Sequence, residues 1–206
     1  MKSKNREKAA QAIEAFLRAI GESSETNVEL RGTGARVADM FMDELCAGNQ
    51  VDPRAVLEEH KLATGDAKGW VIVRDRAIST TCPHHLMPAI GTISMGYLPK
   101  KSIVGLGALG EVADAFSRRL ALQEAIGENI CSAIKTTLEC QAVFALIDLS
   151  HACMTVRGER RHEARVVTIS TKGSIAAQEV ALLLGSVETG KVSVSSLRRE
   201  KRTLMP

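Results

Sequence analysis

Two short clusters of cysteine and histidine constrain the fold of this chain more than any other feature. The first is Cys82-Pro83-His84-His85, and the second is His151-Ala152-Cys153. Sixty-seven residues lie between His85 and Cys153, so a metal bound by both clusters would tie two remote segments together. Pro83 prevents ordinary strand pairing within the first cluster, and a turn that brings Cys82 and His85 together is expected there.

The two clusters offer five candidate metal ligands, which is one more than a closed zinc site needs. If Cys82, His85 and Cys153 bind the ion, one coordination position stays open for water. His84 and His151 then remain beside the metal as proton-transfer groups. Zinc lowers the pKa of bound water to about 7, and this chemistry suits a hydrolase, a deaminase or an amidohydrolase. Two alternatives stay open: a closed Cys2His2 structural site, and a Cys153 that is simply a buried core cysteine.

The composition fits one ordinary domain with an appendage. The chain has 206 residues, of which 45% are apolar and 25% are charged. Its net charge of +3 does not argue for a nucleic-acid partner, because the basic residues cluster in the end segments 2–8 and 198–202, where solvated tails are expected. There is no apolar signal segment and no run near the roughly 20 apolar residues that span a bilayer, so no membrane is expected. Five cysteines in such a chain indicate a reducing cytoplasm.

Hydrophobic spacing predicts an α+β fold. Helices are expected over residues 6–20, 35–46 and 51–60, a long helical region over 112–138, and a last helix over 174–184. Strands are expected over residues 70–73, 89–97, 142–149 and 164–170. Strands that come in pairs around helices favour antiparallel pairing. Because side chains alternate along a strand, His151 and Cys153 are expected on one face of a continuing strand.

The clusters and their surroundings resemble the GTP cyclohydrolase I family in order and spacing, over roughly residues 30–173. Besides the clusters, the matching residues are Val73-Arg74-Asp75, Gly91, Tyr97-Leu98-Pro99, Val104-Gly105-Leu106, Gln123-Glu124, and Met154-x-x-Arg157-Gly158. The resemblance implies a tunnelling fold, in which an antiparallel β-sheet is backed by helices, with an N-terminal helical extension. It also implies a toroidal homodecamer with active sites between subunits. We therefore expect an N-terminal helical region over residues 1–68 and a tunnelling-fold catalytic domain over 69–206.

The resemblance also implies roles for individual residues. It assigns Zn2+ to Cys82, His85 and Cys153, and an acid/base role to His84 and His151 in hydrating C8 of a purine. The implied substrate-binding residues are Glu124 for the guanine N1–H and 2-amino group, Gln123 beside it, Leu106 and Leu122 against the base, and Arg36 and Arg157 as cations. A carboxylate suits this guanine edge, because two adjacent donors need an acceptor. The expected partner is a purine small molecule.

The chain departs from the family pattern where the triphosphate is gripped. Asp39 stands where the family has a lysine, and the family's Ser-Lys-x-x-Arg is replaced by Gly107-Ala108-Leu109-Gly110-Glu111. A like charge in close contact with a phosphate costs on the order of 1 kcal/mol even under solvent screening. Gly107 also lacks the hydroxyl that the family's serine brings to the ribose. An alternative alignment, with Arg118 or Arg119 in place of the missing cations, stays open.

We therefore expect a zinc-dependent cyclohydrolase that hydrolyses C8 of the imidazole ring in a guanine-containing purine with fewer phosphates than GTP. One alternative is conventional GTP cyclohydrolase I activity, which yields 7,8-dihydroneopterin triphosphate for folate and pterin synthesis. A second is a non-catalytic, zinc-stabilised ring that binds a purine or a protein. Nucleic-acid binding through the basic tails would rest on charge alone.

Overall fold

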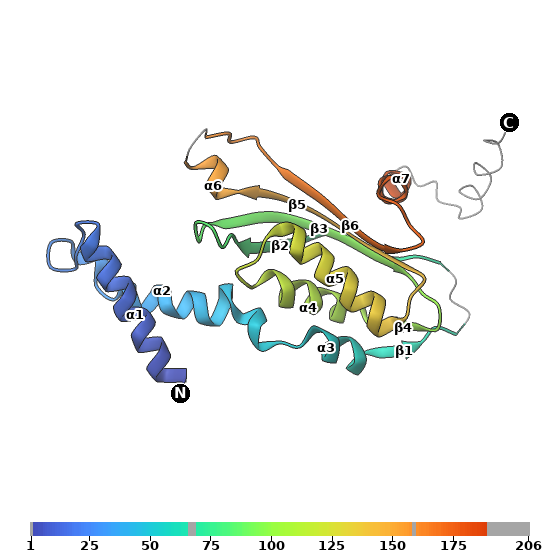
Figure 1. Ribbon diagram of the computed structural model, residues 1–206, viewed down its shortest axis with the longest axis horizontal. Helices are drawn as coiled ribbons and strands as arrows, with labels where there is room; N and C mark the ends of the chain where they lie inside the picture. The colour runs from blue at the N-terminus through green and yellow to red at the C-terminus, as the bar shows by residue number, and fades with distance from the viewer. Residues whose placement is uncertain (1, 66–68, 158–159, 189–206) are drawn as a thin grey trace.

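The centre of the molecule is an antiparallel sheet of four strands in the order β2-β3-β5-β6 (Figure 1). The computed structural model describes residues 2–65, 69–157 and 160–188. The strands are β2 (Val71–Thr81), β3 (Pro88–Leu98), β5 (Ala142–His151) and β6 (Val166–Gly173). Two short strands, β1 (Lys61–Ala63) and β4 (Ser102–Val104), pair with each other apart from this sheet. The predicted α+β fold with antiparallel pairing is confirmed.

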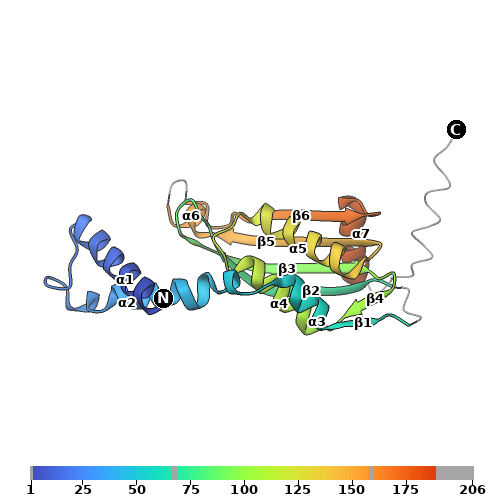
Figure 2. The same cartoon turned by 60° about the horizontal axis from the view of Figure 1, so that its bottom comes forward.

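Helices cover the two faces of the sheet unequally (Figures 1 and 2). Helices α4 (Leu106–Ser117) and α5 (Gln123–Leu138) lie on one face, with α3 (Pro53–Glu59) packed against both, and α7 (Ala177–Glu188) lies on the other. The alternation of β5 explains this division. Its residues Val143, Ala145, Ile147 and Leu149 are fully buried in the main core, whereas Phe144 packs with Val180 and Leu183 of α7.

The N-terminal helices form an arm that projects away from the sheet (Figure 1). Helix α1 (Lys2–Ala19) packs on α2 (Thr33–Asp39), which continues into a π-helical segment, Met40–Leu45. Gly34 permits this close approach, because a Cβ there would lie 2.5 Å from the carbonyl oxygen of Ala10. Helix α3 differs from this arm, since its Leu57 is fully buried in the main core. The boundary at residue 68 between two domains stays a prediction.

The prediction of one helical region over residues 112–138 is wrong at its centre. Helix α4 ends at Ser117 and α5 begins at Gln123. The connection between the two helices contains no glycine or proline, and tertiary contacts keep it in a non-helical conformation. Leu120 pairs with Thr81 in an isolated bridge, and the Arg119 guanidinium donates to the carbonyl oxygen of Gly48 at 2.8 Å. This interruption places the start of α5 beside the end of β2.

No helix in the described ranges is long and apolar enough to cross a membrane. The C-terminal basic segment and Gly158 lie outside the described residues.

Candidate metal centre and active site

The first cysteine–histidine cluster forms the loop between β2 and β3. The Leu86 N–H donates to the Cys82 carbonyl oxygen at 2.9 Å, and the Cys82 N–H donates to the Met87 carbonyl oxygen at 2.9 Å. Residues 83–85 form the expected turn. Leu86 closes the loop in the left-handed region, with φ of 54°. As a result the Cys82 side chain is buried while His84 and His85 are exposed.

The second cluster does not continue as a strand. The expectation that His151 and Cys153 lie on one face of a continuing strand is therefore wrong. Strand β5 ends at His151, which pairs with Ala89, and Cys153 lies in the short helix α6 (Ala152–Thr155). The next residue along β3 is Pro88, which has no N–H to extend the ladder toward Ala152. The chain therefore turns into a helical conformation at this point.

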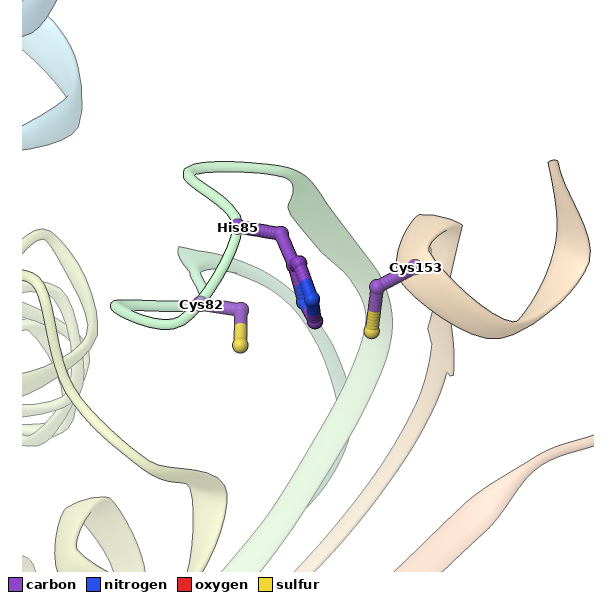
Figure 3. Close-up of side chains that lie close together, drawn as sticks. All are labelled: Cys82, His85 and Cys153. Atoms are coloured by element: carbon purple, nitrogen blue, oxygen red, sulfur yellow. The ribbon is translucent and has the colours of Figure 1, made fainter. Parts of the chain in front are cut away.

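Cys82, His85 and Cys153 nevertheless converge on one point (Figure 3). Their ligand atoms, two sulfurs and one ring nitrogen, all lie within 4.8 Å of one another. Two sulfurs each about 2.3 Å from a tetrahedral zinc ion are roughly 3.8 Å apart, so a small inward movement suffices for binding. This donor set fits zinc, and three protein ligands leave the fourth position open.

The candidate metal centre borders a cavity of about 250 Å³ between the loop, the start of α5 and the end of β5. Its lining includes Cys82, Cys153, His84, His151, Leu122, Gln123 and Glu124. Thr80, Met154 and Val166 also line it, and sequence reasoning did not single them out as contacts. Met154 is next to a predicted ligand, whereas Val166 had no signal, because only the pairing of β6 with β5 brings it here.

Gln123 holds the His151 ring in one orientation. The Gln123 side chain is buried, and its amide nitrogen donates to the carbonyl oxygens of Ile147 at 3.0 Å and Val166 at 2.9 Å. Its amide oxygen must therefore face the Nε2 atom of His151, 2.8 Å away. Because an amide oxygen only accepts, Nε2 carries the proton. The Nδ1 atom of His151 is then the proton acceptor of the neutral ring.

His151 is poised to be neutral near pH 7. Burial lowers the pKa of this imidazole below its ordinary value of 6.5, and the carboxylate of Glu124 acts in the opposite direction. Glu124 is exposed in the first turn of α5, where the helix dipole favours a negative charge. A neutral histidine and a carboxylate therefore share one wall of the cavity.

Comparison with known proteins identifies the family. The sequence profile described as GTP cyclohydrolase I matches residues 9–182. The chain belongs to the GTP cyclohydrolase I family. The resemblance predicted from the motifs is confirmed, and with it the enzyme class, a cyclohydrolase.

Relatives in this family match most of the chain. GTP cyclohydrolase 1 of Corynebacterium aurimucosum is 37% identical over 169 residues, which cover 81% of this chain and 84% of the relative. GTP cyclohydrolase 1 of Halalkalibacterium halodurans is 35% identical over 184 residues, covering 88% and 95%. Among solved structures, the archaeosine synthase QueF-Like in the apo form covers 54% of this chain and 100% of its own, at 12% identity and a TM-score of 0.43. That likeness is too weak to bear on function.

Of three further residues of the GTP cyclohydrolase I pattern, one contacts a candidate metal ligand and two lie outside the cavity. The Arg157 guanidinium donates to Nε2 of His85, so it contacts a candidate metal ligand directly. Leu106 is the exposed first residue of α4, and Arg36 of α2 bonds to the Arg31 carbonyl oxygen at 2.8 Å. Neither Leu106 nor Arg36 lines the cavity within the described chain.

Proposed function

We propose that this chain is a zinc-dependent enzyme of the GTP cyclohydrolase I type that hydrolyses C8 of the imidazole ring of guanine. One observation carries the proposal: the convergence of Cys82, His85 and Cys153 at a cavity that also contains His84 and His151. A structural zinc site would need neither extra histidine. A zinc ion held by the three side chains would supply a water of lowered pKa at neutral pH.

The residues around the cavity divide the remaining work of ring opening. His151, neutral and with Nδ1 free to accept, takes up a proton. His84 is exposed at the same cavity and donates a proton to the ring nitrogen that leaves C8. Glu124 accepts from the guanine N1–H and 2-amino group. The N–H donors of the Gln123 amide are occupied and its oxygen accepts from Nε2 of His151, so we assign Gln123 to His151 rather than to the base.

GTP is the substrate that the comparisons favour. Relatives named GTP cyclohydrolase 1 align over most of the chain, and this supports conventional activity over the smaller substrate expected from the sequence. One objection to GTP also weakens, because the Asp39 carboxylate forms an ion pair with Arg6 between α1 and α2. Arg6 is shared with Asp43, so this pair offsets only part of the negative charge of Asp39. The product would be 7,8-dihydroneopterin triphosphate.

A substrate with fewer phosphates is the second candidate, and the start of α4 favours it. Ala108 is only 2% exposed and packs in the core, so no side chain at this position points to a ligand here. Glu111 is an exposed carboxylate where the family pattern has a cation. Gly107 is exposed and has no hydroxyl for the ribose.

Turnover of GTP, GMP and guanosine by zinc-loaded protein separates the two candidates. The leading proposal expects the highest kcat/KM for GTP, with formation of a pterin. A higher kcat/KM for guanosine or GMP would establish the second candidate.

The His151→Ala variant tests catalysis itself, and turnover should fall by roughly 10²- to 10⁴-fold with zinc content unchanged. Loss of zinc and of the oligomer in this variant would instead support a non-catalytic, zinc-stabilised ring.

We also propose that the chain acts as a homo-oligomer. The cavity of about 250 Å³ is smaller than the roughly 300–1,000 Å³ usual for a small-molecule site, and Leu106 and Arg36 lie outside it. A second copy that brings these residues to the cavity would complete the site. A protein that is monomeric by light scattering and fully active would contradict this.

A cytoplasmic location is proposed because the cysteines at positions 46, 82, 131, 140 and 153 are all unpaired.

A further inference from the structure

A second hollow of about 630 Å³ lies beside β2, and three arginines line it: Arg76, Arg118 and Arg165. We refer to it as the arginine hollow. None of these arginines has a role in the proposed ring opening. Arg76 lies on β2, Arg118 directly follows α4, and Arg165 directly precedes β6, so three separate elements bring positive charge to one place.

Arg76 is fixed in the arginine hollow by a paired carboxylate. Its two terminal nitrogens donate to the two oxygens of Asp114 at 3.0 Å and 2.8 Å, in a bidentate arrangement that also fixes the plane of the guanidinium. The side chain passes over Gly110 of α4, where a Cβ would lie 3.0 Å from the Arg76 Nε atom. Glycine at this position therefore leaves space for the guanidinium.

Arg165 is fixed in a similar way on the other side. Its Nε donates to Oδ1 of Asp148 at 2.7 Å, and its Nη2 donates to the Asp148 carbonyl oxygen at 3.1 Å. A Cβ on Gly91 would lie 3.1 Å from that Nη2, and only 2.0 Å from the same carbonyl oxygen. The close approach of β3 and β5 requires glycine at this position, and the same glycine leaves space for the Arg165 guanidinium.

Arg118 differs from the other two arginines, because its side chain has no hydrogen-bond or ion-pair partner in the part of the chain that the structure describes. Its backbone is fixed, because its N–H donates to the Asp114 carbonyl oxygen at 2.9 Å and its own carbonyl accepts from Gly48 at 3.0 Å. Its exposed side chain makes no hydrogen bond or ion pair within the described residues, although Glu44 and Glu111 line neighbouring hollows. Asp114 and Asp148 are taken up by the other two arginines. The Arg118 guanidinium therefore has no direct ion-pair partner among the described residues, although the Asp114 carboxylate also lines the hollow.

We propose that the arginine hollow binds a phosphate group, with Arg118 as its principal ligand and Arg76 and Arg165 as flanking donors. Guanidinium groups suit phosphate oxygens because they present several N–H donors in one plane. The hollow also lies near the candidate active site. Thr80 lines both the metal-side cavity and a small intervening hollow, and Ser79 and Arg118 line both that intervening hollow and the arginine hollow.

Two sources could present this phosphate: the tail of the nucleotide whose base lies at the metal centre, or a separate phosphorylated effector. Both place the same group on Arg118. The volume of the hollow falls in the range of small-molecule sites, so it admits either.

The binding test uses inorganic triphosphate, zinc-loaded full-length protein and isothermal titration calorimetry. We expect saturable binding to the wild type, a loss of affinity of about tenfold or more in Arg118→Ala, and partial recovery in Arg118→Lys. Arg54→Ala is the matched control, because Arg54 is an exposed arginine of α3 outside the hollow, and its affinity should equal that of the wild type. Circular dichroism checks that each variant is folded. Absence of saturable binding, or equal affinity in the wild type and Arg118→Ala, would overturn the proposal.

A second measurement distinguishes the two sources, and it alone rests on the proposed function. If the substrate tail occupies the hollow, triphosphate inhibits GTP turnover competitively and Arg118→Ala raises KM for GTP but not for guanosine. If a separate effector does, triphosphate binds without competing with GTP. Both outcomes support the site. Failure of ring-opening activity would leave the calorimetric test intact, so the two proposals can fail separately.

Discussion

Gln123 determines which nitrogen of His151 carries the proton, and this makes it the most informative single residue at the metal-side cavity. Gln123→Leu removes the acceptor at Nε2 while keeping a side chain of similar size. We expect kcat to fall by roughly tenfold to a thousandfold with KM nearly unchanged, because the ring loses its preferred orientation and protonation state. Steady-state kinetics on the zinc-loaded variant measure both constants.

The control for this variant is Gln141→Leu. Gln141 is an exposed glutamine whose amide donates to the Pro99 carbonyl oxygen at 2.9 Å, far from the chemistry in the fold. Its kcat should match the wild type. If Gln123→Leu instead raises KM alone, the amide contacts the substrate, as the family resemblance implies.

The pH dependence of activity should report the His151 environment. Because burial lowers its pKa, the neutral base persists below pH 6.5, and the acid limb of kcat/KM should have its midpoint below that value. The Glu124 carboxylate favours the protonated ring, so Glu124→Gln removes a contribution that raises the pKa. The acid limb should then move to still lower pH. A midpoint that moves upward in this variant would show that another group controls the limb.

At the scale of elements, periodicity predicted the helices and strands well where burial is continuous. The residues of β5 alternate between two packed faces, and apolar spacing located that strand within two residues of its observed ends. The interruption after Ser117 was not predictable from local signals, since it depends on Thr81, Arg119 and Gly48, which are remote in sequence. The end of β5 was missed for a similar reason: the proline that stops the ladder lies on the neighbouring strand.

The same distinction applies to the candidate site. The convergence of Cys82, His85 and Cys153 was predictable because cysteine and histidine clusters carry a chemical signal in their spacing. The role of Gln123 was not, because its hydrogen bonds depend on the register between β5 and β6. Arg36 and Leu106 were predicted to bind substrate from the family pattern alone. Neither residue lines the cavity in the described chain, and nothing in the sequence around them predicts a contact with it.

Helix α3 should behave as part of the main core in stability measurements. Leu57 is fully buried among residues of the core formed with α4 and α5. Leu57→Ala should lower the free energy of unfolding by about 2–5 kcal/mol, because it removes apolar contacts and leaves a cavity. Urea denaturation monitored by circular dichroism measures the change. Leu62→Ala in β1 is the matched control, since Leu62 is 60% exposed, and its cost should stay within about 0.5 kcal/mol.

A loss below about 0.5 kcal/mol for Leu57→Ala would mean that α3 contributes little to the core. It would then support grouping residues 53–63 with the N-terminal arm, as the predicted boundary at residue 68 does.

At the scale of the whole molecule, the metal centre and the hydrophobic core occupy different places. The three candidate ligands join the β2–β3 loop to α6 at one end of the sheet (Figures 1 and 3). The main core lies between the sheet and helices α3, α4 and α5 and contains none of the three ligands. The core therefore does not depend on the metal for its packing.

Removal of the metal should accordingly abolish turnover without unfolding the protein. After treatment with a chelator, we expect no detectable ring opening, a far-ultraviolet circular dichroism spectrum close to that of the untreated protein, and recovery of turnover on adding Zn2+ but not Mg2+, whose preferred ligands are oxygens. Cys153→Ser should lose bound zinc, measured by atomic absorption. Cys46→Ser should keep it, because Cys46 is a partly buried cysteine outside the cluster. Cooperative unfolding on chelation would instead indicate a closed structural site, in which a fourth protein ligand occupies the position that hydrolysis needs for water.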